Sequence, residues 1–371
     1  MMRSDPMFQI TFVQATIRDF MAYGPMPAMT ESDVHRMVRL YMPRNLDDLS
    51  NNYDVTVLFE ANVHAVSPHI DKLARGTSER GLGMAMCGGW QSFGGAAGYS
   101  PWGETSVGKL LPTEDVIGIW DESDMQRLVI DEPGNELMSS IPWDPRDPAL
   151  SGPIWHHNRV SLKQGATQLA HVVTGSGSKD PLMVTWRLPS DTRTFALTSE
   201  SCRLVEIFGM RWEYAYDYAS NLMIYLDDRP VPQDIALVHA ARDEIFKTAT
   251  RRSLLLALLE FCESFGANVN PITDKIDQVD AAAGEAVPQY LDLRFEDVLD
   301  TYDTVDELLE SAELEAVKLK NRTLLWVYII EWLAVTGTSM ACGFILWSLM
   351  VRRRLYREVG TTALLRRDES P

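Results

Sequence analysis

The chain has 371 residues, more than one compact domain usually holds, and its 46% hydrophobic and 23% charged residues are typical of globular proteins. A formal net charge of −18 argues against nucleic-acid partners, because so acidic a body repels phosphates. The four cysteines form no CxxC pair and no Cys/His spacing, so the sequence predicts no disulfide framework, no metal site and no cofactor.

The first part of the chain alternates strand-like and helix-like segments. Residues 8–15, 53–60 and 82–87 are short β-rich runs. Residues 30–40 indicate a helix, with Thr30 as its N-cap and apolar residues repeating at helical spacing. This order predicts an α/β domain with a mostly parallel sheet, in which binding sites lie beyond the carboxyl ends of the strands.

The middle of the chain predicts a hairpin followed by helices. Residues 182–188 and 194–198 are β-rich and flank a Pro-Ser-Asp turn, and residues 212–226 indicate a closing helix. After two prolines the composition changes. Residues 234–265 are helical, residues 266–300 are mixed and rich in Pro and Asp, and residues 305–320 form a charged helix, which together predict a stalk.

Residues 324–351 form an apolar run whose only charged residue is Glu331, and three arginines follow it directly. About twenty apolar helical residues span the roughly 30 Å hydrocarbon core of a bilayer, so this run predicts one transmembrane helix. A buried core helix is the alternative. The lipid bilayer is therefore the expected partner, and the charged helix or the small residues of the span offer a contact for a second membrane protein.

These features divide the chain into four expected parts: residues 1–235 as the α/β domain, 236–322 as the stalk, 323–351 as the transmembrane helix and 352–371 as a basic tail. The sequence predicts a single-pass cell-membrane protein. The arginines after the span favour a cytoplasmic tail, whereas the absence of a signal-peptide pattern at the N-terminus favours a cytoplasmic domain; we expect the domain in the cytoplasm.

Four segments carry a family resemblance: GLGMAMCGGWQSFGGAAGYSPWGET at 81–105, NRVSLKQGA at 158–166, WEYAYDYASNL at 212–222 and RPVPQD at 229–234. Together they resemble the class I glutamine amidotransferase-like superfamily over about residues 5–240. The resemblance implies a flavodoxin-like sheet with helices on both faces. It also implies a nucleophile elbow after one strand, where active members use a Cys with a late His and Glu to release ammonia from glutamine.

The elbow pattern falls on Cys87, which the run Gly88, Gly89, Trp90 and Gln91 follows. Two departures stand out. Ala85 replaces the usual glycine, and the late His-x-Glu motif falls on Thr198-Ser199-Glu200, which keeps Glu200 but lacks the His. A thiol nucleophile needs a base. Two readings follow: a non-catalytic binding domain with a buried structural Cys87, or an active amidohydrolase in which His156 or His157 replaces the missing base and Glu200 orients it.

A ligand site is expected at the same place. The glycines of this loop offer backbone amides to an anion, Trp90 and Trp102 offer rings for stacking, and Glu60 ends a neighbouring strand. Tight packing of the glycines and aromatic residues is the alternative. The sequence therefore predicts a small-molecule site formed by Glu60, residues 88–91 and Trp102.

Overall fold

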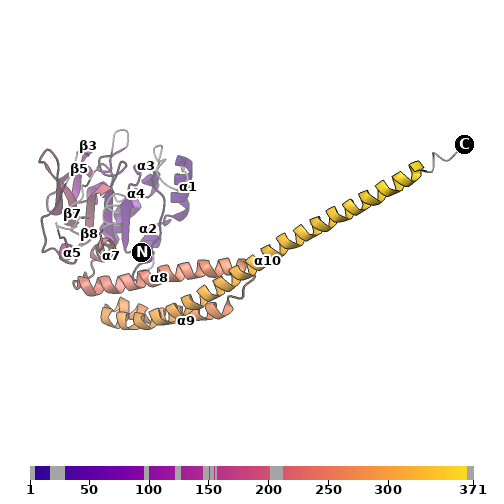
Figure 1. The fold of residues 1–371 in the computed structure, drawn as a ribbon. Helices are drawn as coiled ribbons and strands as arrows, with labels where there is room; N and C mark the ends of the chain where they lie inside the picture. The colour runs from indigo at the N-terminus through magenta and orange to yellow at the C-terminus, as the bar shows by residue number, and fades with distance from the viewer. Residues whose placement is uncertain are drawn as a thin grey trace. The chain divides into compact units, whose positions relative to one another are not determined.

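The protein is described by a computed structural model, which covers residues 5–16, 30–95, 100–121, 127–144, 150, 154, 157–200 and 212–365. The chain forms two compact units (Figure 1). The first comprises residues 1–246 and 288–299, and the second comprises residues 247–287 and 300–371. The first turns of the long helix at 235–264 thus belong to the α/β unit, and the rest of that helix belongs to the stalk.

The helices, with 3₁₀ turns marked η, are α1 (Glu31–Tyr41), α2 (Leu46–Asn52), α3 (Val63–Val66), η1 (Ser67–His69), α4 (Ile70–Arg80), η2 (Gly108–Leu110), α5 (Glu136–Ser139), α7 (Ala215–Leu226), α8 (Ile235–Ser264), α9 (Asn270–Leu291) and α10 (Phe295–Leu365). The strands are β1 (Val55–Phe59), β2 (Gly83–Gly88), β3 (Thr113–Asp121), β4 (Arg127–Ile130), β5 (His157–Leu162), β6 (Thr167–Val173), β7 (Lys179–Arg187) and β8 (Arg193–Glu200).

The sheet is mixed, which corrects the expectation of a mostly parallel, flavodoxin-like sheet. Its main path runs β1-β2-β8-β7-β6-β4, and only β1, β2 and β8 are parallel neighbours. β8, β7, β6 and β4 pair antiparallel, and β3 pairs antiparallel with β5 beside β8. The reason is connection length: short turns join β6 to β7 and β7 to β8, and such turns can link only antiparallel strands.

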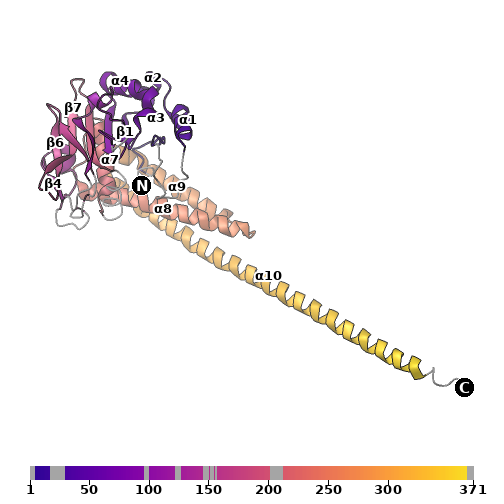
Figure 2. The same ribbon diagram turned by 90° about the horizontal axis from the view of Figure 1, so that it is seen from above.

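Buried side chains form two cores, one on each face of the sheet. Ala85 and Cys87 of β2 face a core that contains α5 and α7, whereas Met84 and Met86 face a core that contains residues of α1 to α4. Successive strand residues point to opposite faces, which explains this alternation. The domain is therefore a sheet covered by helices on both sides, as Figure 2 also shows.

The segment at 8–15, expected to be a strand, is irregular in the structure. It nevertheless makes contacts beside β1: the Ala15 carbonyl accepts a hydrogen bond from the Asn62 amide at 2.9 Å, and the Thr11 hydroxyl accepts one from the Tyr53 hydroxyl at 3.2 Å. Its apolar residues pack on both cores without joining the strand ladder. Apolar periodicity alone did not distinguish these two outcomes.

The stalk unit contains three long helices. Residues 266–300, expected to be mixed, are largely the helix α9, in which Ile272, Ile276 and Val279 recur at helical spacing and are buried. α10 then runs for 71 residues without a break. Its apolar part is long enough and hydrophobic enough to cross a membrane, and none of its most apolar stretch is buried in the structure.

Candidate functional site

The carboxyl ends of β1 and β2 bring several predicted site residues together. The two strands are parallel and pair Phe59 with Cys87, so Glu60 and Gly88 follow at the same edge of the sheet. The carboxylate oxygen Oε1 of Glu60 accepts a hydrogen bond from the Trp90 backbone amide at 3.3 Å. Glu60 and the start of the glycine loop therefore form one small structural unit.

Close packing explains the two glycines of this unit. A Cβ at Gly88 would lie 2.0 Å from the Thr198 carbonyl oxygen, and a Cβ at Gly89 would lie 2.4 Å from Cγ of Glu60. Gly89 also has a φ of +152°, which side chains rarely adopt. Both positions thus require glycine for packing, which accounts for them without a bound phosphate.

Asn158, the first residue of the NRVSLKQGA run, holds the loop in place. Its buried side chain accepts a hydrogen bond from the Gly89 amide at 2.9 Å and donates to the carbonyls of Gly89 and Ser92 at 3.0 and 3.2 Å. It was not among the residues predicted for the site. The available signal was its place in a segment that carried the family resemblance.

Two residues at this edge have left-handed backbones that favour glycine. Glu60 has a φ of 46° and Phe93 a φ of 52°. The Thr16 hydroxyl donates to the Glu60 carbonyl at 3.0 Å, and the Phe93 carbonyl accepts from the Trp102 amide at 2.7 Å. Such strain costs roughly 1–3 kcal/mol per residue and clusters at functional sites.

The predicted ligand-binding side chains differ in accessibility. Trp90 is 37% exposed and Glu60 is half-buried, so both reach the surface. Gln91 and Trp102 are buried, and the Trp102 indole nitrogen donates to the carbonyls of Ala61 and Gln91, each at 3.0 Å. Trp102 therefore supports the loop from beneath, and the surface presented to a ligand is that of Glu60 and Trp90.

Cys87 lies inside the apolar core with 3% of its surface exposed. Tyr218 is one of its neighbours, and burial, together with the nearby Cys87 sulfur, raises the pKa of Tyr218 far above its ordinary value. Cys87 is not among the described residues with positive φ. Turns, and not a helix, occupy the described residues directly after β2, so the strand-turn-helix geometry of a nucleophile elbow is not formed there.

Of the other predicted catalytic residues, the structure describes His157 and the backbone of Glu200. His157 is fully buried on β5, and its Nε2 lies 2.9 Å from an Asp180 carboxylate oxygen. Burial opposes ionisation of Asp180, but hydrogen bonds from Ser178 and His157, with the charge of Arg159, lower the pKa of its carboxyl. Glu200 is the last residue of β8. The side chain of Glu200 and the whole of His156 lie outside the described residues.

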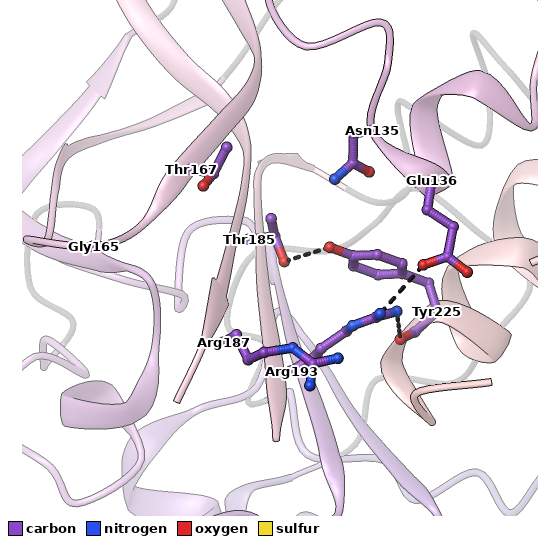
Figure 3. A pocket seen from close by; sticks show the side chains of 8 residues that line it. All are labelled: Asn135, Glu136, Gly165, Thr167, Thr185, Arg187, Arg193 and Tyr225. Carbon is purple, nitrogen blue, oxygen red and sulfur yellow. Dashed lines mark hydrogen bonds and ion pairs between the residues drawn. The ribbon is translucent and has the colours of Figure 1, made fainter. Parts of the chain in front are cut away.

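A cleft not predicted from sequence lies at the other end of the strands, where β7 ends and β8 begins, and has a volume of about 260 Å³ (Figure 3). The Arg193 guanidinium stacks on the Tyr225 ring at 4.2 Å, donates to the Tyr225 carbonyl at 2.9 Å and meets Glu136 at 3.2 Å. Arg187 pairs with Asp191 and Asp228. Both arginines are thus neutralised by carboxylates, which favours a structural role over anion binding.

Comparisons with known proteins assign no family. No family model matches the chain, and no curated protein matches it. Among solved structures, cytoplasmic protein STM1381 from Salmonella typhimurium LT2 is similar, with 18% identity and a TM-score of 0.44 over 52% of this chain and 79% of that one. Cytoplasmic protein STM3548 from Salmonella typhimurium is similar as well, with 17% identity and a TM-score of 0.44 over 52% of this chain and 78% of that one. The glutamine amidotransferase-like resemblance therefore stays a prediction.

The described residues contain no group of three or more His, Cys, Asp or Glu side chains arranged to hold a metal ion. Among the described residues, the β1–β2 edge brings the Glu60 carboxylate and the exposed Trp90 indole to a tightly packed glycine turn. The indole can stack on a flat group, and the carboxylate can accept hydrogen bonds from that group or pair with a positive charge on it.

Proposed function

We propose that this chain is a single-span membrane protein whose α/β domain binds a ligand or partner at the Glu60–Trp90 edge and carries out no Cys87-dependent chemistry. Membrane attachment is supported by the apolar part of α10, which is long and apolar enough to cross a bilayer. Three arginines at 352–354 follow that part directly. The proposal keeps the domain on the cytoplasmic side.

The burial of Cys87 is the observation that carries the non-catalytic part of the proposal. A thiol nucleophile must be reachable by substrate and must be converted to its thiolate. Cys87 instead packs with Tyr218 in a core of aliphatic and aromatic side chains, an environment that disfavours a charged thiolate. His157, one of the two candidate bases, is engaged by Asp180.

The binding part rests on the edge itself. The backbone of Glu60 and Phe93 is strained there, and the Trp90 indole and the Glu60 carboxylate reach the surface. Asn158 holds the turn that contains Gly89 in place. Preorganised polar groups beside an apolar ring are the usual elements of small-molecule recognition. A flat ligand with a hydrogen-bond donor or a cationic group matches this chemistry best.

The catalytic question is tested with the purified full-length protein in detergent, incubated with glutamine while ammonia release is measured. We expect the same background rate for the wild type and for Cys87→Ala. Cys262→Ala, which removes a buried thiol in the stalk, is the matched control for unspecific effects. Ammonia release that disappears in Cys87→Ala alone contradicts the non-catalytic assignment.

Membrane attachment is tested separately by alkaline carbonate extraction of cell membranes. A protein held by a transmembrane helix stays in the pellet, whereas a peripheral protein is released. We expect the full chain in the pellet and its release only by detergent. Recovery in the carbonate supernatant contradicts the anchoring.

A further inference from the structure

We propose that the free end of the stalk rests on the lipid headgroups of the bilayer that α10 crosses. This end, called the stalk tip below, consists of residues 264–273, which include the end of α8, the connection and the first turn of α9, together with Phe261. The inference rests on the proposed membrane anchoring and adds a second, peripheral contact between the stalk and the lipid surface.

Ion pairs within the stalk unit set the level of the stalk tip along α10. Arg251 of α8 pairs with both Asp306 and Glu313 of α10, so residue 251 lies level with about residue 310. The chain runs along α8, returns along α9 and leaves along α10, so α8 and α10 point the same way. Both helices rise about 1.5 Å per residue, which brings residue 265 level with about residue 324, where the apolar span begins.

A second pair of contacts places the start of α9 about six residues lower along α10. Lys275 of α9 binds Glu315 at 2.6 Å and Ser311 at 2.8 Å, which places residue 275 level with about residue 313. α9 runs opposite to α10, so its first residue, Asn270, lies level with about residue 318. The stalk tip therefore lies beside the last turns of α10 before the span.

The charge of α10 changes sign at this level. Residues 300–315 of α10 carry seven acidic and no basic residues, whereas residues 318–322 carry Lys318, Lys320 and Arg322 and no acidic residue. The ten residues 264–273 of the stalk tip carry no charge, and the exposed carboxylates Glu260, Glu263 and Asp274 border them. Lys318, Lys320 and Arg322, called the basic collar below, can bind anionic lipid headgroups beside this uncharged loop. The same headgroups would repel the acidic residues 300–315, which lie farther from the span.

The stalk tip also exposes aromatic surface. Phe261 of α8 and Phe265 of the following turn are 41% and 51% exposed, and their rings lie 5.1 Å apart. Leu255, Leu259 and Cys262, on a neighbouring face, are buried among the stalk helices. The two phenylalanines are therefore not needed for the stalk core. Insertion among headgroups removes them from water.

A second copy of the chain is the competing occupant of this apolar face. Two copies in one membrane are parallel, so their acidic α10 segments would approach each other at the same level, which like charges disfavour. The uncharged loop and the basic collar have no counterpart in such a pair. Lipid headgroups account for all three features, and we commit to them.

The test uses the full chain with its native cysteines replaced by alanine, carrying one new cysteine labelled with an environment-sensitive fluorophore. The labelled protein is reconstituted into vesicles of phosphatidylcholine and phosphatidylglycerol that contain spin-labelled lipids. Asn268→Cys reports on the stalk tip. Ser253→Cys, exposed on α8 and roughly 15 Å farther from the span, is the matched control, and Met340→Cys reports on the span.

We expect lipids labelled near the headgroup to quench the probe at residue 268 several-fold more than the probe at residue 253, and lipids labelled deep in the chain to quench the probe at residue 340. The double variant Phe261→Ser and Phe265→Ser should reduce quenching at residue 268, whereas Leu254→Ser, on the same face but farther from the span, should not.

Quenching at residue 340 without quenching at residue 268 overturns the inference and leaves the anchoring intact. No quenching at residue 340 overturns both. A blue-shifted but unquenched probe at residue 268, which becomes water-exposed when the protein is diluted in lipid, shows that a second copy covers this face and also overturns the inference.

Discussion

Replacing Asn158 by alanine should destabilise the α/β domain, because this side chain holds the glycine loop at the Glu60–Trp90 edge. The substitution leaves the Gly89 amide and the carbonyls of Gly89 and Ser92 without their side-chain partner in a site that is 1% exposed. Each of these hydrogen bonds contributes roughly 1 kcal/mol, so the free energy of unfolding should fall by about 3 kcal/mol. For a domain of this size, Tm should fall by about 9 °C.

Thermal unfolding followed by near-ultraviolet circular dichroism measures this loss, because that signal reports on packed aromatic side chains. Asn158→Asp is the sharper variant. Its carboxylate keeps one oxygen as the acceptor for the Gly89 amide but places the other oxygen, in the position of Nδ2, against two carbonyl oxygens. The variant should therefore be at least as unstable as Asn158→Ala. If Asn158→Asp unfolds at the temperature of the wild type, the assigned role of Asn158 in holding this loop is wrong.

Three further predictions concern the packing at Gly88, the carboxyl of Asp180 and the side of the membrane on which the domain lies. Gly88→Ala should lower the free energy of unfolding by more than about 2 kcal/mol, because its Cβ would lie 2.0 Å from the Thr198 carbonyl oxygen. Gly134→Ala, whose Cβ would have no atom within 4 Å, is the control and should leave the thermal unfolding unchanged. Equal unfolding temperatures for the two variants refute the packing argument. The pKa of Asp180 is lower in the folded protein than its ordinary value of about 3.8, so its ionised form contributes stability above that pH, and this contribution is lost as the pH falls through the folded-state pKa. Asp180→Asn should therefore reduce the loss of stability on the acid side of a stability-pH curve. An unchanged slope contradicts this prediction. In sealed right-side-out spheroplasts the domain should resist added protease and should become sensitive after lysis, and cleavage before lysis contradicts a cytoplasmic domain.

Local signals in the sequence predicted much of the secondary structure. Thr30 caps α1 through a reciprocal pair with Asp33, as its residue type and the helical pattern indicated. The hairpin of β7 and β8 turns at Asp191, whose φ of 66° suits the residue types at that turn. The apolar run after residue 323 continues the charged helix before it, as expected.

Long-range pairing was harder to predict. Strands β3 to β6 were not recognised, and their antiparallel pairing makes the sheet mixed. Within α9, the prolines and aspartates suggested irregular structure, but burial of Ile272, Ile276 and Val279 stabilises the helix, and Pro288 lies near its end. In both cases tertiary packing outweighed local propensity.

For the candidate site, the sequence located the edge but not its internal arrangement. Parallel pairing of β1 and β2 brings Glu60, Gly89 and Trp90 together, as their positions after two strands suggested. The burial of Trp102 and the clamp by Asn158 depend on contacts between residues 41 and 69 positions apart in the chain. No local pattern specifies such contacts.

The unbroken course of α10 fixes a rotational phase between stalk and span. Each residue of an α-helix turns the next by about 100°, so the direction of every side chain after residue 323 is set by the direction of those buried in the stalk, such as Ala316. One residue inserted at this junction would turn the whole span by about 100° relative to the stalk, whereas an insertion of seven would nearly restore the original azimuth. In the membrane-anchored protein that we propose, the stalk thus selects the side of the span that faces neighbouring lipids or helices.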